Sequence, residues 1–218
     1  MKTVRFARSG TAERLRERRW PYRGPGRRLG SMSRLRRLVP SDLDEAQRIL
    51  YDRIVGGPRA NGPRPAGLTD TDGALRGPFN AMLYAPAVGE ALQSLGAAVR
   101  FGTGLSDRVR EIAILAVAAH WESSFERYAH EAIGRAVGLG EEIIEALGAG
   151  VEPPLTDPTE RAAYRVVRAL LAQRDLDDAH FADARSELGE AALVELSTVV
   201  GYYGTLALQL RLFRVEAP

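Results

Sequence analysis

Apolar residues recur along most of the chain every three to four positions, which is the spacing of helices with one buried face. No segment alternates apolar and polar residues convincingly, so the pattern predicts no strand. The predicted helices cover residues 41–55, 78–100 with a break before Pro86, 107–120, 124–137, 141–150, 158–174, 177–188 and 189–213. We therefore predict an all-α fold in a single domain, a helical bundle.

Capping residues support several of these helix starts. Ser41, Ser106 and Asp157 are predicted N-caps, and Asp157 is followed by a proline at the first helical position. Between the first two helices, residues 56–78 hold six glycines and four prolines in 23 positions, which predicts a long irregular loop. The helical segments 111–119 and 196–213 carry few charges, and this predicts more apolar surface than one small bundle buries. We expect a homo-oligomer for that reason.

Charge is distributed unevenly along the chain. Residues 1–37 hold 13 of the 30 basic residues and only two acidic ones, so the remainder has a net charge of −9. Since residues 1–31 lack periodic hydrophobicity and Met32 opens a sequence typical of a natural start, we interpret residues 1–31 as a disordered or mis-assigned extension before a domain at 32–218. Phosphate contacts by this basic segment, and so nucleic-acid binding, are the less favoured alternative.

The composition excludes several function classes. The sequence has no cysteine, which rules out disulfides, thiolate metal sites and thiol redox chemistry. No stretch of about 20 consecutive apolar residues indicates a membrane span, and the basic N-terminus lacks the apolar segment of a signal peptide. We therefore expect a cytoplasmic protein that does not associate with membranes. Patterns typical of hydrolases, nucleotide-binding proteins and metalloproteases are also missing, and neither His120 nor His180 has a partner at metal-ligand spacing.

Candidate chemistry centres on two consecutive helices. Glu111 is the only charged residue between positions 111 and 119, so burial there would favour its use in proton sharing. A glutamate facing solvent or pairing with Arg108 is the structural alternative. On the next helix, Ser123, Glu126 and His130 have the spacing i, i+3, i+7, which places them on one face. Histidine is the side chain best matched to proton transfer near neutral pH.

Ser123 and Glu126 also fit a capping box, in which both side chains would bond to free amide groups at the helix start. This structural role and a role in a site are both open at the level of the sequence. His130 has no such local explanation.

The segment LSDRVREIAILAVAAHWESSFERYAHEAIGRAVGLGEEIIEAL resembles the core motif of the carboxymuconolactone decarboxylase family, which includes alkylhydroperoxidase D-like proteins. The flanking segments 77–108 and 199–215 resemble one branch of that family, and the resemblance covers roughly residues 33–215. It implies an alkylhydroperoxidase D-like helical bundle that assembles as a trimer or a multiple of it. Peroxidase-type members carry two cysteines where this chain has Ser123 and Glu126, so thiol peroxidase activity is not expected here.

The resemblance therefore implies the decarboxylase branch, in which an unsaturated lactone with a γ-carboxyl group loses CO2 and is protonated at carbon. His130 is the candidate acid/base and Glu111 its orienting or proton-sharing partner. Ser123, Glu126, Asn80 and Phe79 are candidate substrate contacts, although simple turn packing is the favoured explanation for the last two. No cofactor and no metal are expected. A peroxidase-like oxidoreductase and a non-catalytic oligomeric binding protein are the alternative functions.

Overall fold

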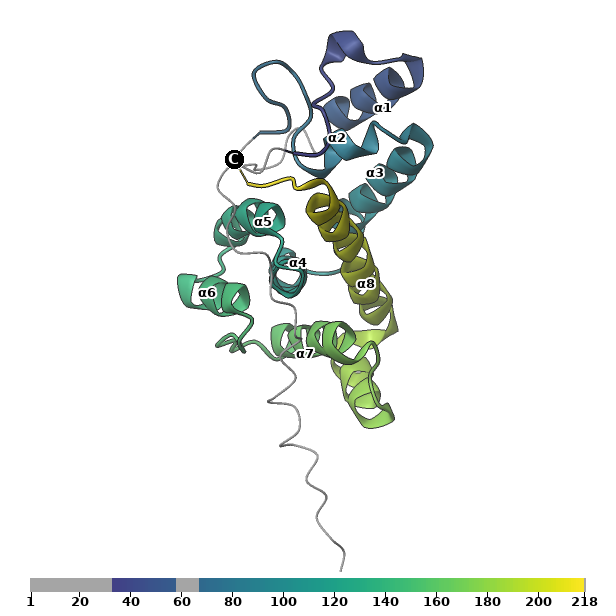
Figure 1. Ribbon diagram of the computed structural model, residues 1–218. Coiled ribbons are helices and arrows are strands. Elements are labelled where there is room, and N and C mark those ends of the chain that lie inside the picture. Colours follow the sequence, from purple (N-terminus) through teal and green to yellow (C-terminus); the bar gives the residue numbers. More distant parts are fainter. Residues whose placement is uncertain (1–32, 58–66, 218) are drawn as a thin grey trace, which may run out of the picture. The chain divides into compact units, whose positions relative to one another are not determined.

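The computed structural model describes residues 33–57 and 67–217, and these contain eight α-helices (Figure 1). The helices are α1 (Glu45–Gly56), α2 (Pro78–Met82), α3 (Pro86–Phe101), α4 (Asp107–His120), α5 (Ser124–Ala136), α6 (Glu141–Ala149), α7 (Pro158–Gln173) and α8 (Asp178–Phe213). In this part of the chain the only β-type pairing is an isolated bridge between Thr69 and Leu75. The predicted all-α class is confirmed. The predicted extension at 1–31 and residues 58–66 of the predicted loop lie outside the described residues.

Two of the predicted N-caps form as expected. The Ser106 side chain accepts a hydrogen bond from the amide of Val109 at the start of α4. Asp157 does the same for the amide of Glu160 at the start of α7, where Pro158 occupies the first helical position. Both caps satisfy amide groups that have no acceptor within their own helix, so α4 and α7 begin where the sequence predicts.

The predicted start of α1 is wrong by one turn. Its N-cap is Asp44, whose carboxylate accepts from the Gln47 amide while the Gln47 side chain accepts from the Asp44 amide. Ser41 instead lies in a short 3-10 turn at Pro40–Asp42. The reciprocal pair of bonds at Asp44 satisfies two groups where a serine cap would satisfy one, which explains the later start.

α8 contains a break that separates the two helices predicted at its place. Gly189 has φ 79° and ψ 164°, a conformation outside the helical region that is open essentially to glycine alone. By length and composition α8 could cross a membrane, and it is the one such helix among the described residues. The core helix of a globular bundle passes the same test, and α8 packs against α3, α4 and α7 along its length.

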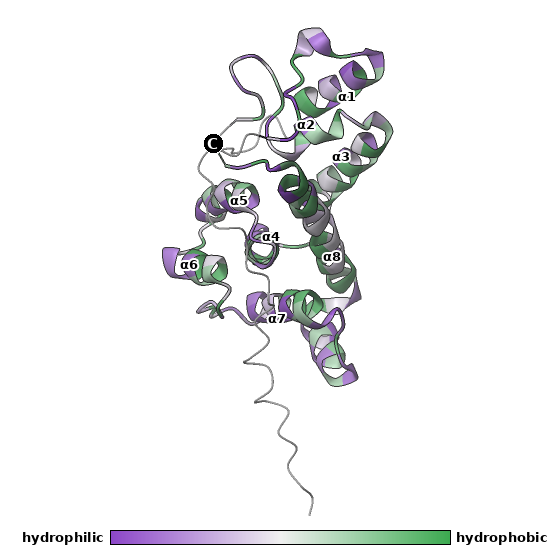
Figure 2. Cartoon of the chain, in the orientation of Figure 1, coloured by the Kyte–Doolittle hydropathy of each residue, from purple (hydrophilic) through white to green (hydrophobic). Residues whose placement is uncertain are grey.

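α4 is the central helix of the bundle. Every side chain from Val109 to Ala118 is buried, because α4 packs against α5, α6, α7 and α8 (Figure 1). α8 also contacts α2 and α3, so it connects the α1–α3 group of helices to the α4–α7 group. The hydrophobic residues concentrate on the sides of α8 and its neighbours that face this core (Figure 2). A polar side chain on α4 is therefore forced into an apolar surrounding, which is the origin of the site described next.

Candidate active site

Glu111 lies in the core of the bundle, with only 1% of the residue exposed. It belongs to the second turn of α4, whose N-terminal cap at Ser106 fixes the helix register. The alternative of a solvent-facing glutamate is thereby excluded. Arg108 does not pair with it either, since its guanidinium binds the Glu160 carboxylate (Nη2–Oε2, 3.0 Å). A buried carboxylate needs partners of its own, because water cannot stabilise its charge.

His130 of α5 supplies that partner. Its Nδ1 lies 2.7 Å from Oε2 of Glu111, and the His130 residue is 6% exposed. When Nδ1 carries the proton it donates this hydrogen bond, so the carboxylate fixes both the tautomer and the orientation of the ring. This leaves Nε2 as the nitrogen that can exchange a proton with a third group. The structure thus brings together the two residues predicted as the reactive pair.

Glu126 lies beside the second ring nitrogen. One helical turn before His130 on α5, it is buried and its Oε2 is 3.5 Å from Nε2. The imidazole is therefore placed between two carboxyl groups, one at each nitrogen. The contact at Nδ1 is a short hydrogen bond, whereas the contact at Nε2 is longer than a usual hydrogen bond. Nε2 is therefore the ring nitrogen that is more weakly bound within the protein.

Ser123 occupies the N-cap position of α5, yet it forms no capping hydrogen bond with its side chain. Its Oγ is buried and has no hydrogen-bond partner. The capping-box alternative is therefore wrong on the Ser123 side, and the Glu126 carboxylate lies against His130. A buried hydroxyl without a partner costs about 1–3 kcal/mol, which is a reason to ask what would bind to it.

Two residues of the cluster escaped the sequence analysis. Arg100, in the last turn of α3, places Nη1 3.7 Å from the free oxygen of Glu111, Oε1. Tyr203 of α8 meets the His130 ring edge-on, with ring centroids 5.1 Å apart at 90°. Burial raises the pKa of Tyr203 well above its usual range, and the nearby negative charge of Glu126 raises it further. Tyr203 therefore keeps its hydroxyl proton next to the two carboxyl groups.

Weak signals for both residues exist in the sequence. Arg100 is the only basic residue of α3. Tyr202 and Tyr203 are two adjacent aromatic residues within the long uncharged segment of α8. Neither signal connects its helix with α4 or α5. The juxtaposition of Arg100 and Tyr203 with His130 depends on the packing of four helices.

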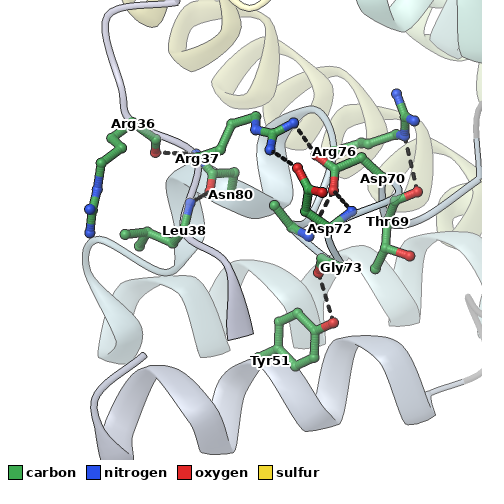
Figure 3. Close-up of polar contacts among 11 residues, drawn as sticks. Arg36, Arg37, Leu38, Tyr51, Thr69, Asp70, Asp72, Gly73, Arg76 and Asn80 are labelled. Atoms are coloured by element: carbon green, nitrogen blue, oxygen red, sulfur yellow. Dashed lines mark hydrogen bonds and ion pairs between the residues drawn. The ribbon is translucent and has the colours of Figure 1, made fainter. Parts of the chain in front are cut away.

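Asn80 and Phe79 have mainly structural contacts. The Asn80 amide accepts from the Leu38 backbone amide (3.0 Å) and donates to the Arg36 carbonyl (3.1 Å), as Figure 3 shows. Phe79 is buried in the hydrophobic core. The turn that precedes α2 nevertheless reaches α5, because a Cβ atom on Gly77 would lie 2.3 Å from the Phe125 ring. The turn therefore packs against Phe125 of α5, while the Asn80 side chain is bonded to residues 36–38.

The same polar network anchors the described part of the predicted loop. Arg37 pairs with Asp70 (2.7 Å) and with Asp72 (2.5 Å), and the Tyr51 hydroxyl donates to the Gly73 carbonyl (2.8 Å) (Figure 3). These contacts hold residues 69–76 against α1 and the chain before it. They are structural contacts, and none of them reaches the His130 cluster.

The other histidines lie outside the cluster. His120 ends α4, and burial lowers its pKa, with the positive charge of Arg168 adding to the effect. His180 is exposed and bonds to the Asp177 cap of α8. Within the described residues no three metal-binding side chains come together. What the cluster can do is hold a proton on an imidazole between two carboxyl groups, out of contact with bulk water, and pass it to a bound molecule.

The comparisons with known proteins agree with the resemblance seen in the sequence. Residues 86–169 match the sequence model of the carboxymuconolactone decarboxylase family. This segment contains Arg100, Glu111, Ser123, Glu126 and His130. Among proteins with curated descriptions, none matches this sequence.

Solved structures share the fold. One is the alkylhydroperoxidase AhpD core of an uncharacterized peroxidase-related protein from Ralstonia eutropha JMP134, with a TM-score of 0.67 and 14% identity over 87% of this chain and 94% of that one. A protein of unknown function from Agrobacterium tumefaciens, for which an antioxidant defence role of the AhpD type has been suggested, has a TM-score of 0.58 and 22% identity over 66% of this chain and 99% of its own.

A third structure is a cysteine-to-alanine variant of the debrominase Bmp8 in complex with 2,3,4-tribromopyrrole. It has a TM-score of 0.61 and 13% identity over 87% of this chain and 93% of that one. At these identities the three structures establish the fold alone. The predicted alkylhydroperoxidase D-like bundle is confirmed. The match at residues 86–169 supports the predicted carboxymuconolactone decarboxylase family.

Proposed function

We propose that this protein, whose residues 86–169 match the carboxymuconolactone decarboxylase family and whose fold is AhpD-like, is a cofactor-free proton-transfer enzyme of the lyase class. Its substrate is a small carboxylated lactone or a related acid. The observation that carries the proposal is the position of His130, 2.7 Å from Glu111 at one ring nitrogen and 3.5 Å from Glu126 at the other.

The chemistry requires few groups. In an unsaturated lactone with a γ-carboxyl group, the bond between the ring carbon and the carboxylate breaks, CO2 leaves, and the electron pair moves into the conjugated carbonyl. The resulting enolate then takes one proton at carbon. Because the substrate's own carbonyl accepts the electrons, the protein has only to bind the acid, exclude water and deliver that proton.

His130 delivers the proton in this proposal. Glu111 holds the ring and stabilises its charged form, as a carboxylate does for the histidine of other acid–base sites. Glu126 adjoins Nε2 and can return a proton to the ring after each turnover. Ser123 contributes a buried Oγ that has no hydrogen-bond partner, and its hydroxyl can donate to the carbonyl oxygen as negative charge develops there.

The AhpD-like neighbours raise a second enzyme class, the thiol peroxidases. A peroxidase cycle of that kind passes through a thiolate and a disulfide, and the sequence has no cysteine. Peroxide consumption with a dithiol reductant should therefore not exceed the rate without protein. The third class, a binding protein without activity, predicts ligand binding with no turnover.

The test is an assay of CO2 release from a panel of unsaturated lactones with a γ-carboxyl group, run in D2O so that NMR detects deuterium at the protonated carbon. We expect His130→Ala to lower kcat roughly 100- to 10,000-fold, the usual contribution of one acid–base group. His180→Ala removes an exposed histidine and serves as the matched control, with unchanged kcat. Equal turnover by His130→Ala and the native protein would refute the assignment of the site.

A further inference from the structure

The cluster holds an arginine whose hydrogen-bonding capacity is not used. Arg100 has a side chain only 12% exposed, and among the described residues its guanidinium donates no hydrogen bond. Its nearest acceptor is Oε1 of Glu111, and the 3.7 Å separation from Nη1 exceeds hydrogen-bond length. The planar guanidinium therefore keeps donor groups that a bound acceptor can use.

The other arginines near the site are already bound. Each of them reaches a carboxylate or a carbonyl within hydrogen-bond distance. These are Arg108 with Glu160, Arg110 with Asp107, Arg127 with Glu131 and Arg135 with Glu141. Arg110 also keeps a buried Nε without a partner, but its Nη2 is held by Asp107. Arg100 differs from these four because its guanidinium donates no hydrogen bond at all among the described residues.

Arg100 and Glu111 form no hydrogen bond with each other, because Nη1 and Oε1 are 3.7 Å apart. Oε1 of Glu111 is buried and has no hydrogen-bond partner, while Oε2 is held by His130. Ser123 Oγ is a second buried atom without a partner. Buried polar atoms in native proteins nearly always have partners, so these two atoms, together with an arginine that donates no hydrogen bond, mark a place where a ligand completes the bonding.

We propose that Arg100 binds the carboxylate of the substrate, and that the site takes small monoanionic acids bearing a second oxygen that Ser123 can contact. This inference rests on the proposed function and adds to it the anchor of the reacting molecule. The planar guanidinium matches a carboxylate in a two-point contact, which a lysine cannot reproduce. Held in this way, the substrate lies next to Glu111 and within the reach of His130.

The charges around Arg100 predict that a proton is taken up when the acid binds. Glu111 of α4 lies next to Arg100, and His130 of α5 connects it to Glu126 of the same helix and to Tyr203 of α8. Two carboxyl groups already oppose one permanent cation, so an entering carboxylate is accompanied by a proton taken from water. The reaction itself consumes one proton, R–COO⁻ + H⁺ → R–H + CO2. Binding of the acid thus supplies the cluster with the proton that is later transferred to carbon.

The test uses two probes that share one lactone ring and differ in whether the carboxyl group is charged or esterified. The first is 5-oxotetrahydrofuran-2-carboxylate, a saturated lactone acid without the conjugation that decarboxylation needs, and the second is its methyl ester. Calorimetry with the full-length protein should show that the acid binds at least tenfold more tightly than the ester. Repeating the titration in buffers of different ionisation enthalpy should show uptake of protons with the acid only.

Substitutions then assign the effect to Arg100. Arg100→Gln should abolish the preference for the acid, and Arg100→Lys should keep part of it. Arg135→Gln, which removes an exposed arginine paired with Glu141, is the matched control and should bind like the native protein. If Arg100→Gln does not fold, the double variant Arg100→Gln/Glu111→Gln removes both charges together and should also lose the preference.

Two results would overturn the proposal. One is equal affinity of the native protein for acid and ester, or binding of neither. The other is an Arg100 variant that keeps the preference within twofold of the native protein. The outcome is separable from that of the lyase proposal, because Arg100-dependent binding without turnover retains the anchor and rejects the lyase. Turnover that depends on His130, with a KM that does not change in the Arg100 variants, retains the lyase proposal and rejects Arg100 as the anchor.

Discussion

At the scale of the residue, the protein places an imidazole between two buried carboxyl groups and surrounds it with groups that water cannot reach. Glu111 is fixed by the start of α4 and Glu126 by the first turn of α5, so neither depends on a loop. Rigid helices hold such a constellation more accurately than loops do. Tyr203 closes the cluster from α8 and stays protonated there.

The protonation of Tyr203 predicts a loss of stability at alkaline pH. Burial, with the charge of Glu126, raises its pKa above the ordinary value of 10.0, so above that pH the unfolded chain releases a proton that the folded chain keeps. The unfolded state then binds fewer protons, and the free energy of unfolding falls as pH rises, by up to about 1.4 kcal/mol per pH unit for one such group.

Urea unfolding of the native protein and of Tyr203→Phe at pH 8 and at pH 10.5 measures this effect. The native protein should lose more stability between the two values than the variant, which retains the weaker contribution of Tyr164, whose pKa burial also raises. An identical loss in both proteins would mean that Tyr203 ionises normally in the folded state.

At the scale of the element, α8 depends on one glycine. Gly189 joins the two halves of α8 at φ 79° and ψ 164°, and Gly201 lies within the second half in ordinary helical conformation. A Cβ atom would meet nothing within 4 Å at either position. The two glycines therefore differ in backbone conformation and not in the space around them.

Alanine substitution at both positions separates these effects. Gly189→Ala should destabilise the protein by roughly 1–3 kcal/mol, because residues with a Cβ atom rarely adopt this backbone conformation. Gly201→Ala should stabilise it by about 0.5–1 kcal/mol through the higher helix propensity of alanine. Thermal or urea unfolding measures both. If Gly189→Ala were also neutral or stabilising, the break at this position would not exist in solution.

At the scale of the whole molecule, α8 leaves an uncharged strip exposed along its second half. The strip consists of the exposed residues Val194, Ser197, Gly201, Thr205, Leu208 and Leu212, with the half-buried Thr198 beside them. Its three hydroxyl groups already donate to carbonyls of the same helix, so they would not be left without partners if the strip were covered. A strip of this kind is suited to the homo-oligomer, a trimer or a multiple of it, that the sequence predicts.

A charge in this strip should oppose assembly. We expect Leu208→Glu to lower the molar mass measured by light scattering or sedimentation toward that of a single chain, because an unpaired carboxylate is costly in an apolar interface. Val151→Glu also places a charge on an exposed apolar residue but lies outside α8, and it should leave the mass unchanged. An oligomer that tolerates Leu208→Glu would place the interface elsewhere.

The sequence by itself determined what depends on neighbours along the chain. Helical periodicity, the caps at Ser106 and Asp157 and the break before residue 189 are local, so they could be predicted. The shared face of Ser123, Glu126 and His130 follows from their spacing on one helix. The lack of cysteine needs no structure at all.

The tertiary structure decided everything that depends on contacts between helices. Whether the Ser123 side chain caps α5, and whether Glu111 pairs with Arg108 or with His130, are choices between contacts of similar local plausibility. The packing of α3, α4, α5 and α8 made these choices, because burial of the apolar core outweighs any single polar contact at a helix end. Arg100 and Tyr203 join the cluster for the same reason, and no spacing along the chain encodes their approach.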